Sequence, residues 1–140
     1  MKKHTFILIV IFGLFFSGCK KDEDQHVDEL KMQIDNEDEI LFEVTTEILG
    51  SKVKIDGNNS SKTLQLQVPV DAIEGDYQSF VIFYAENNNP VFSAFNINGK
   101  NLHVSKNDME NRIVTGTFSV NYIDDLQNPH TATGSFEVAY

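Results

Sequence analysis

The sequence predicts an all-β domain, an antiparallel β-sandwich or partly closed β-barrel of about eight or nine strands. From residue 30 onward, apolar and polar residues alternate in short runs, which is the period of half-buried strands. Turn-forming Asn, Asp, Gly and Pro residues separate these runs. Near the C-terminus, the sequence TGTF at residues 115–118 recurs as TGSF at residues 133–136, as expected for two paired strands.

The first two predicted strands lie at residues 30–35 and 40–49. The first alternates apolar and polar residues strictly, which favours a strand with one wet face. A helix through Val27, Leu30 and Ile34 is the alternative, but it would be short and weakly capped. Branched and aromatic residues dominate the second strand, and one of its faces would carry Phe42, Val44, Thr46 and Ile48.

A hairpin and a central strand are predicted next. The hairpin has strands at residues 53–55 and 64–68, with its turn at residues 56–59, where Asp, Gly and two Asn follow one another. A short loop is expected at residues 70–75. Residues 80–84 are apolar on both faces, which indicates a central strand covered on both sides.

The dipeptide Asn98-Gly99 predicts a two-residue hairpin turn, because both residues of such a turn must tolerate positive φ. The resulting register pairs Phe95 with Leu102 and places Phe92 and His103 on the face opposite the core. An exposed patch of Phe92 and His103 would suit the stacking of a sugar or the docking of a protein. We favour the alternative, in which a second sheet covers these residues, because large exposed apolar patches are rare in monomers.

The repeated motif near the C-terminus predicts a specific strand register. If the two strands fold back around Leu126, Gly116 faces Phe136 and Gly134 faces Phe118. Each aromatic ring then covers a strand glycine on the neighbouring strand. Two unrelated glycines at β-bulges are the alternative. They are the less economical explanation, because one register accounts for both glycine–phenylalanine pairs.

The N-terminus has the pattern of an export signal. Lys2 and Lys3 precede about eleven apolar residues, which is within the length of a signal-peptide core and well short of the roughly 20 residues of a membrane-spanning helix. Small residues at positions 17 and 18 then precede Cys19, so residues 1–19 resemble a bacterial lipoprotein signal. The resemblance implies removal of residues 1–18 and attachment of diacylglycerol and an N-acyl chain such as palmitate to Cys19.

Residues 19–29 are expected to form a charged, flexible tether, followed by a single domain at residues 30–140. The acids at positions 22–24 are similar to the export signal that takes some Bacteroidota lipoproteins to the outer surface of the outer membrane. Three further segments resemble a family of small Bacteroidota lipoproteins of unknown function: residues 34–35 (ID), 73–77 (IEGDY) and the closing TGTF and TGSF pair. The family usually has glycine where this chain has Asn36. The resemblance implies an all-β domain and carries over no catalytic residue.

The net charge and the cysteine content limit the possible functions and the means of stabilisation. Removal of Lys2 and Lys3 with the signal peptide takes the formal net charge from −10 to −12, which disfavours binding to nucleic acid. The lipid would occupy the single cysteine, so the folded domain must be stable without a disulfide.

No candidate active site emerges from the sequence. It lacks a G-x-S-x-G motif, and the histidines of the mature chain, His26, His103 and His130, stand far apart along it. Asp124 and Asp125 fall at the predicted hairpin tip, where solvated turn residues are expected. We therefore expect neither enzymatic activity nor a cofactor or metal. The expected function is a non-enzymatic binding or accessory module, held in the membrane by lipid on Cys19, with a protein or a glycan as partner. The alternative is a structural or assembly subunit of an envelope complex.

Overall fold

The structure, a computed structural model, describes residues 26–140 and confirms the all-β class. Across these residues there is no helix, and hence none long and apolar enough to span a membrane. All strands belong to one antiparallel sheet of order β5-β8-β9-β10-β1-β2-β3-β4-β6-β7. The strands are β1 (Glu29–Ile34), β2 (Ile40–Leu49), β3 (Lys52–Asn59), β4 (Lys62–Pro69), β5 (Gly75–Tyr77), β6 (Val81–Glu86), β7 (Asn89–Phe92), β8 (Ile97–Asp108), β9 (Ile113–Ile123) and β10 (Pro129–Ala139).

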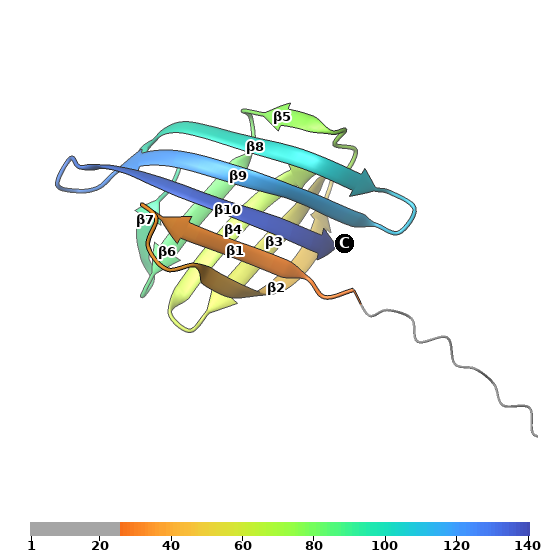
Figure 1. Ribbon diagram of the computed structural model, residues 1–140, viewed down its shortest axis with the longest axis horizontal. Coiled ribbons are helices and arrows are strands. Elements are labelled where there is room, and N and C mark those ends of the chain that lie inside the picture. The colour runs from red at the N-terminus through yellow and green to blue at the C-terminus, as the bar shows by residue number, and fades with distance from the viewer. Residues whose placement is uncertain (1–25) are drawn as a thin grey trace, which may run out of the picture.

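The sheet curls into a half-barrel because β2 belongs to two layers. Residues 40–42 of β2 pair with β1, whereas residues 43–49 pair with β3. Strands β8, β9, β10 and β1 therefore form a front layer that crosses over β3, β4 and β6 behind it (Figure 1). The partly closed architecture matches the prediction, although there are ten strands instead of eight or nine. The additional strand is β5, a three-residue edge strand that the sequence does not separate from the loop before it.

The core lies between the two layers and contains a chain of aromatic rings in edge-to-face and tilted contact. Phe42, Tyr84, Phe92 and Tyr122 succeed one another with ring centroids 6.5, 5.4 and 5.1 Å apart. All four side chains are buried, and they come from both layers. These rings join the front and back of the half-barrel through apolar contact, and burial of apolar surface is the dominant driving force for the folding of such a domain.

The predicted C-terminal hairpin is confirmed residue by residue. Gly116 lies opposite Phe136 and Gly134 lies opposite Phe118, in a hairpin centred on Leu126. A Cβ atom at Gly116 would lie only 2.6 Å from Cζ of Phe136, and one at Gly134 would collide with Cζ of Phe118. Both rings therefore occupy the space that a side chain on the glycine would need.

The predicted hairpin at Asn98-Gly99 is wrong. Both residues lie inside β8, which is irregular between Ile97 and Gly99 and pairs with β9 almost along its whole length. The chain turns earlier, at residues 93–96. There the Asn96 side chain accepts a hydrogen bond from Ser93 N (2.8 Å) and donates to the carbonyls of Val91 (2.8 Å) and Ile123 (3.1 Å). The long pairing of β8 with β9, together with the hydrogen bonds of the Asn96 side chain, outweighs the preference of Asn98-Gly99 for a turn.

Two other predicted elements, a hairpin and a strand, do form, but the position of the turn and the coverage of the strand differ from the prediction. The hairpin of β3 and β4 turns at Ser60 and Ser61, so Gly57 lies within β3 instead of in the turn. There it is covered by the side chains of Phe42 and Leu30, in the same way as the C-terminal glycines. The strand predicted at residues 80–84 becomes β6, next to the edge strand β7, and 40% of Val81 is exposed.

The folded domain begins before residue 30, so the predicted tether at residues 19–29 is too long at its C-terminal end. Glu29 belongs to β1, and Asp28 accepts a hydrogen bond of 2.7 Å from the backbone N–H of Ala139 at the end of β10. The folded domain therefore includes residues before position 30. The predicted signal peptide and residues 19–25 lie outside the described residues.

Candidate functional site

The structure does not bring the predicted site residues together. Phe92 is fully buried in the core on β7, so it cannot belong to a surface patch. His103 lies on the outer face of β8, with its Nδ1 3.0 Å from Oδ1 of Asp76. The two residues were placed on one face only by the Asn98-Gly99 register, and they separate because that hairpin does not form. Cys19 lies outside the described residues.

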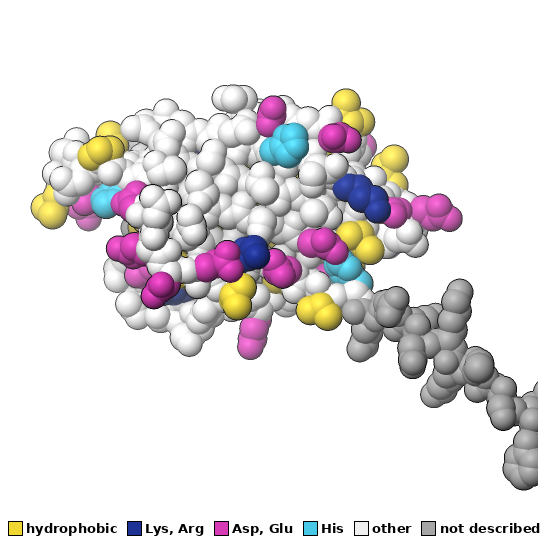
Figure 2. Space-filling model, viewed as in Figure 1, with side chains coloured by type: hydrophobic (Ala, Val, Ile, Leu, Met, Phe, Trp, Pro, Cys, Tyr) yellow, Lys and Arg dark blue, Asp and Glu magenta, His cyan; other side chains and the backbone are white. Residues whose placement is uncertain are grey.

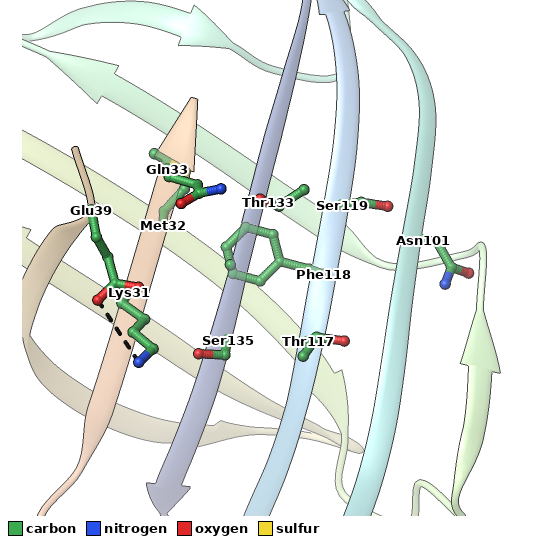
Figure 3. A pocket seen from close by; sticks show the side chains of 11 residues that line it. Lys31, Met32, Gln33, Glu39, Asn101, Thr117, Phe118, Ser119, Thr133 and Ser135 are labelled. Atoms are coloured by element: carbon green, nitrogen blue, oxygen red, sulfur yellow. Dashed lines mark ion pairs between the residues drawn. The ribbon is translucent and has the colours of Figure 1, made fainter. Parts of the chain in front are cut away.

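A hollow of the surface lies instead on the outer face of β1, β10, β9 and β8. It encloses about 360 Å³, which is at the small end of the range for ligand sites. Figure 3 shows its side chains projecting from these four strands and from the residue before β2. Its lining consists of Lys31, Met32, Gln33, Glu39, Asn101, Thr117, Phe118, Ser119, Thr133, Gly134 and Ser135.

Two rows of polar side chains run across the strands of this hollow. Strand pairing places Asn101, Ser119, Thr133 and Gln33 in one row. The next row contains His103, Thr117, Ser135 and Lys31, with His103 at its outer end. Small hydroxyl side chains occupy the middle of both rows and longer side chains occupy the ends, so the centre is hollow.

The same period-two pattern that fills the core produces this outer face. In β9 and β10 the glycines and phenylalanines of the repeated motif point inward, so the alternate Thr and Ser residues must point outward. Gly134 carries no side chain, and the ring of Phe118 lies beneath it and contributes to the floor of the hollow. The repeated motif therefore determines both the packing of the hairpin and the chemistry of its outer face.

The hollow is polar but almost neutral. The ammonium group of Lys31 lies 3.0 Å from Oε1 of Glu29 and 3.8 Å from Oε1 of Glu39, and the second pair is drawn in Figure 3. The hydrogen bond to Glu29 and the charges of both carboxylates raise the pKa of Lys31, so the lysine stays charged and paired. Within residues 26–140, no hydrogen-bond partner is found for the hydroxyls of Thr117, Ser119, Thr133 and Ser135. They are available to a ligand that carries hydroxyl groups of its own.

A larger hollow of about 800 Å³ lies between the β1–β2 and β3–β4 turns, but its chemistry is less specific. Acids dominate its lining, with Glu37, Asp38, Glu39 and Glu86 near a single cation, Lys62. No group of three His, Cys, Asp or Glu residues in the described part of the chain is arranged to hold a metal ion. We therefore regard the hydroxyl-lined hollow as the candidate site.

A histidine held between two carboxylates is the strongest electrostatic feature of the domain. His130 Nδ1 lies 2.5 Å from Oδ2 of Asp35 and its Nε2 lies 3.3 Å from Oδ2 of Asp124, while the ring stacks on Tyr122 at 5.2 Å. Asp35 also accepts a hydrogen bond from the Thr131 backbone N–H. Both ring nitrogens are occupied by carboxylates, so neither is free to act as a base toward a nucleophile. The cluster joins the β1–β2 turn to the β9–β10 turn and is a structural ion pair.

This cluster predicts a pH dependence of stability. The hydrogen bond to Asp35 raises the pKa of His130 above 6.5, so its contribution is complete below pH 6.5 and is lost as pH rises through the raised value. Hydrogen bonds from Asn128 lower the pKa of Asp124 from 3.8 to about 2, so its contribution is present above pH 3.8 and is lost as pH falls toward 2. We expect the urea midpoint to be highest between these limits and the alkaline decline to flatten in His130→Gln. An unchanged alkaline slope in that variant would show that the ion pair does not stabilise the domain.

Sequence reasoning missed both features. The histidine cluster joins residues 95 positions apart through a turn in which Asp35 and Asn36 adopt positive φ (48° and 63°). A positive φ at Asn36 is the conformation that glycine, the residue of the resembled family, adopts without strain. The hydroxyl rows did have a signal, because Thr and Ser recur at alternate positions around the repeated glycines.

Comparison with known proteins adds no further assignment. No model of a known protein family matches this chain. No curated protein matches its sequence significantly. The resemblance to small Bacteroidota lipoproteins therefore stays a prediction.

Proposed function

We propose that this protein is a lipid-anchored, non-enzymatic binding module of the outer membrane that presents the hydroxyl-lined hollow to a neutral, hydroxyl-rich ligand such as a glycan. The observation that carries the proposal is the pair of polar rows on β8, β9, β10 and β1, whose central hydroxyls have no hydrogen-bond partner in the described domain. The export pattern that ends at Cys19 supports the anchor and the location at the cell surface.

The chemistry of the hollow favours a neutral ligand over a charged one. Its only cation, Lys31, is already paired with two carboxylates, so an anion would find no free positive charge. A cation would meet only Glu39, which is itself partly neutralised by Lys31. Hydroxyl and amide groups both donate and accept hydrogen bonds, which matches the alternating donors and acceptors of a sugar ring. The volume of about 360 Å³ is sufficient for one or two such rings.

The edges of the sheet do not favour the alternative of an assembly subunit. The terminal strands β5 and β7 are only three and four residues long, which leaves little backbone for another strand to pair with. What does favour it is the fully exposed Phe95, whose loop is hydrogen-bonded to the end of β9, just before the turn that carries the exposed Leu126. A protein that bound there would contact the end of the domain opposite to the tether.

Replacing the central hydroxyls tests the binding proposal. We expect the double variant Thr117→Val with Thr133→Val to keep the fold and to weaken glycan binding roughly ten- to a hundredfold, because two hydrogen bonds of about 0.5–1.5 kcal/mol each are lost. The intact lipoprotein, purified in detergent, would first be screened on a glycan array, and the affinity for the best glycan would then be measured by calorimetry. Thr45→Val, an exposed threonine of β2 outside the hollow, is the matched control. Equal binding by the double variant and the parent would refute this site.

A further inference from the structure

Exposed apolar side chains gather at the end of the domain from which the tether leaves. Of the nine large hydrophobic residues that are exposed within residues 26–140, five lie at this end. Antiparallel pairing brings the β2–β3, β4–β5 and β8–β9 loops to the start of β1. Figure 2 shows hydrophobic groups along this edge, on either side of the point where the chain enters. The five residues, which we call the apolar tips, are Val27, Ile48, Leu49, Ile73 and Met109.

The loops that carry Ile73 and Met109 are held in place by side-chain hydrogen bonds. Ile73 is 77% exposed, yet its backbone N–H donates to the Tyr77 hydroxyl and its carbonyl accepts from the same hydroxyl, both at 2.9 Å. The Asn107 amide, in β8, donates to the carbonyls of Val70 (2.9 Å) and Ala72 (3.0 Å) in the same loop.

The turn that carries Met109 is fixed in a similar way. Asp108 accepts hydrogen bonds of 3.0 Å from the backbone N–H and from the side-chain amide of Asn111. Met109 is 66% exposed on this turn. Ile73 and Met109 are therefore exposed on loops that hydrogen bonds hold in place. Apolar side chains that gather on one exposed surface commonly mark a contact with a protein or a membrane.

We infer that the apolar tips dock on the surface of the bilayer that holds the lipid of Cys19, so that the strands stand upright on the membrane. The inference rests on the proposed lipid anchor. Val27 follows Cys19 by only eight positions, so even a fully extended chain of about 3.5 Å per residue holds Val27 within about 28 Å of the anchor. The tether therefore leaves from the end with the apolar tips and keeps that end closest to the lipid.

Charge at this end selects the kind of lipid surface. The loops also carry three acids, Asp71, Glu74 and Glu110, against one cation, Arg112, so their net charge is negative and anionic headgroups would repel them. Zwitterionic headgroups fit better. The covalent tether supplies a high effective concentration, so a shallow insertion of a few side chains is sufficient even though it would be weak for a free domain.

A fluorescent label at single positions tests the docking. The full-length lipidated protein is reconstituted in vesicles of phosphatidylethanolamine and phosphatidylcholine, with Ile73→Cys or Met109→Cys carrying an environment-sensitive nitrobenzoxadiazole dye. Leu126→Cys is the matched control, because this apolar turn residue is 81% exposed at the opposite end. We expect a blue shift, and loss of emission to lipid-borne nitroxides, at Ile73 and Met109 but not at Leu126.

Other outcomes overturn the inference in distinguishable ways. If the dyes at both ends behave alike while the protein stays with the vesicles, the anchor holds and the docking is wrong. The parent has Cys19 as its only thiol. If the parent reacts with the thiol-specific dye and does not remain bound to the vesicles, the proposed anchor is wrong, and the docking is wrong with it. Adding anionic phosphatidylglycerol should reduce the quenching at Met109, and an increase would contradict the choice of a zwitterionic surface.

Discussion

Truncation of Phe118 to alanine is expected to lower the free energy of unfolding by about 3–5 kcal/mol, the usual cost of removing a buried aromatic ring. Phe118 is only 3% exposed, and its ring lies across Gly134 of the neighbouring strand. Gly134 has no side chain that could fill the space, so the cavity would remain beside bare backbone. The loss would be a large part of a typical stability of about 5–15 kcal/mol. Urea unfolding followed by far-ultraviolet circular dichroism measures it, since the chain has no tryptophan.

A double-mutant cycle separates the glycine–phenylalanine pairing from burial alone. Gly134→Ala would place a Cβ against both Cζ of Phe118 and the carbonyl oxygen of Lys31, so it should destabilise the domain in either background. Phe118→Leu removes only the ring contact, so the cycle should show coupling of about 0.5 kcal/mol or more. Additive effects would mean that the ring and the glycine do not act as a pair.

Replacement of Cys19 with alanine is expected to abolish acylation and, with it, attachment to the membrane through lipid. The variant lacks the only thiol to which diacylglycerol could be attached, and the short apolar run before it cannot span a bilayer. Labelling cells with an alkyne fatty acid, followed by fractionation, measures both acylation and location. We expect no label on the variant, and either an unprocessed chain or release from the membrane fraction.

The matched control is Phe16→Leu, which places at the third position before Cys19 the residue most common in such signals. It should be labelled at least as well as the parent, because the cysteine and the small residues remain. Equal labelling of Cys19→Ala and the parent would refute the lipoprotein interpretation, and the docking of the apolar tips would fall with it.

The sequence predicted an element correctly where strand alternation met no strong competing signal. In the C-terminal hairpin, strand alternation and the complementary glycine–phenylalanine pairs require the same register, and the structure has it. At β1, alternation competed only with a weak helical pattern, and the strand forms. Such features are local, because both partners of each contact lie within one hairpin or one strand.

Predictions that relied on a single turn signal were wrong. Asn98-Gly99 favours a tight turn locally. The pairing of β8 with β9, which comes later in the chain, stabilises the domain more than that turn would. Phe92, which the local register placed on the face opposite the core, is buried between Tyr84 and Tyr122 from opposite layers, in line with the favoured alternative that this face is covered. The free energy of a turn preference is small compared with that of burying an aromatic side chain, so burial decides where Phe92 lies.

By itself the sequence determined the strand class, the C-terminal register and the export pattern, because each depends on residues that are close together along the chain. Only the tertiary structure decided the bend of β2, the contact of His130 with Asp35, the hydroxyl-lined hollow and the gathering of the apolar tips at one end. These features depend on which distant strands become neighbours. That choice is made by the summed burial of the whole core, to which no short stretch of sequence contributes enough to reveal it.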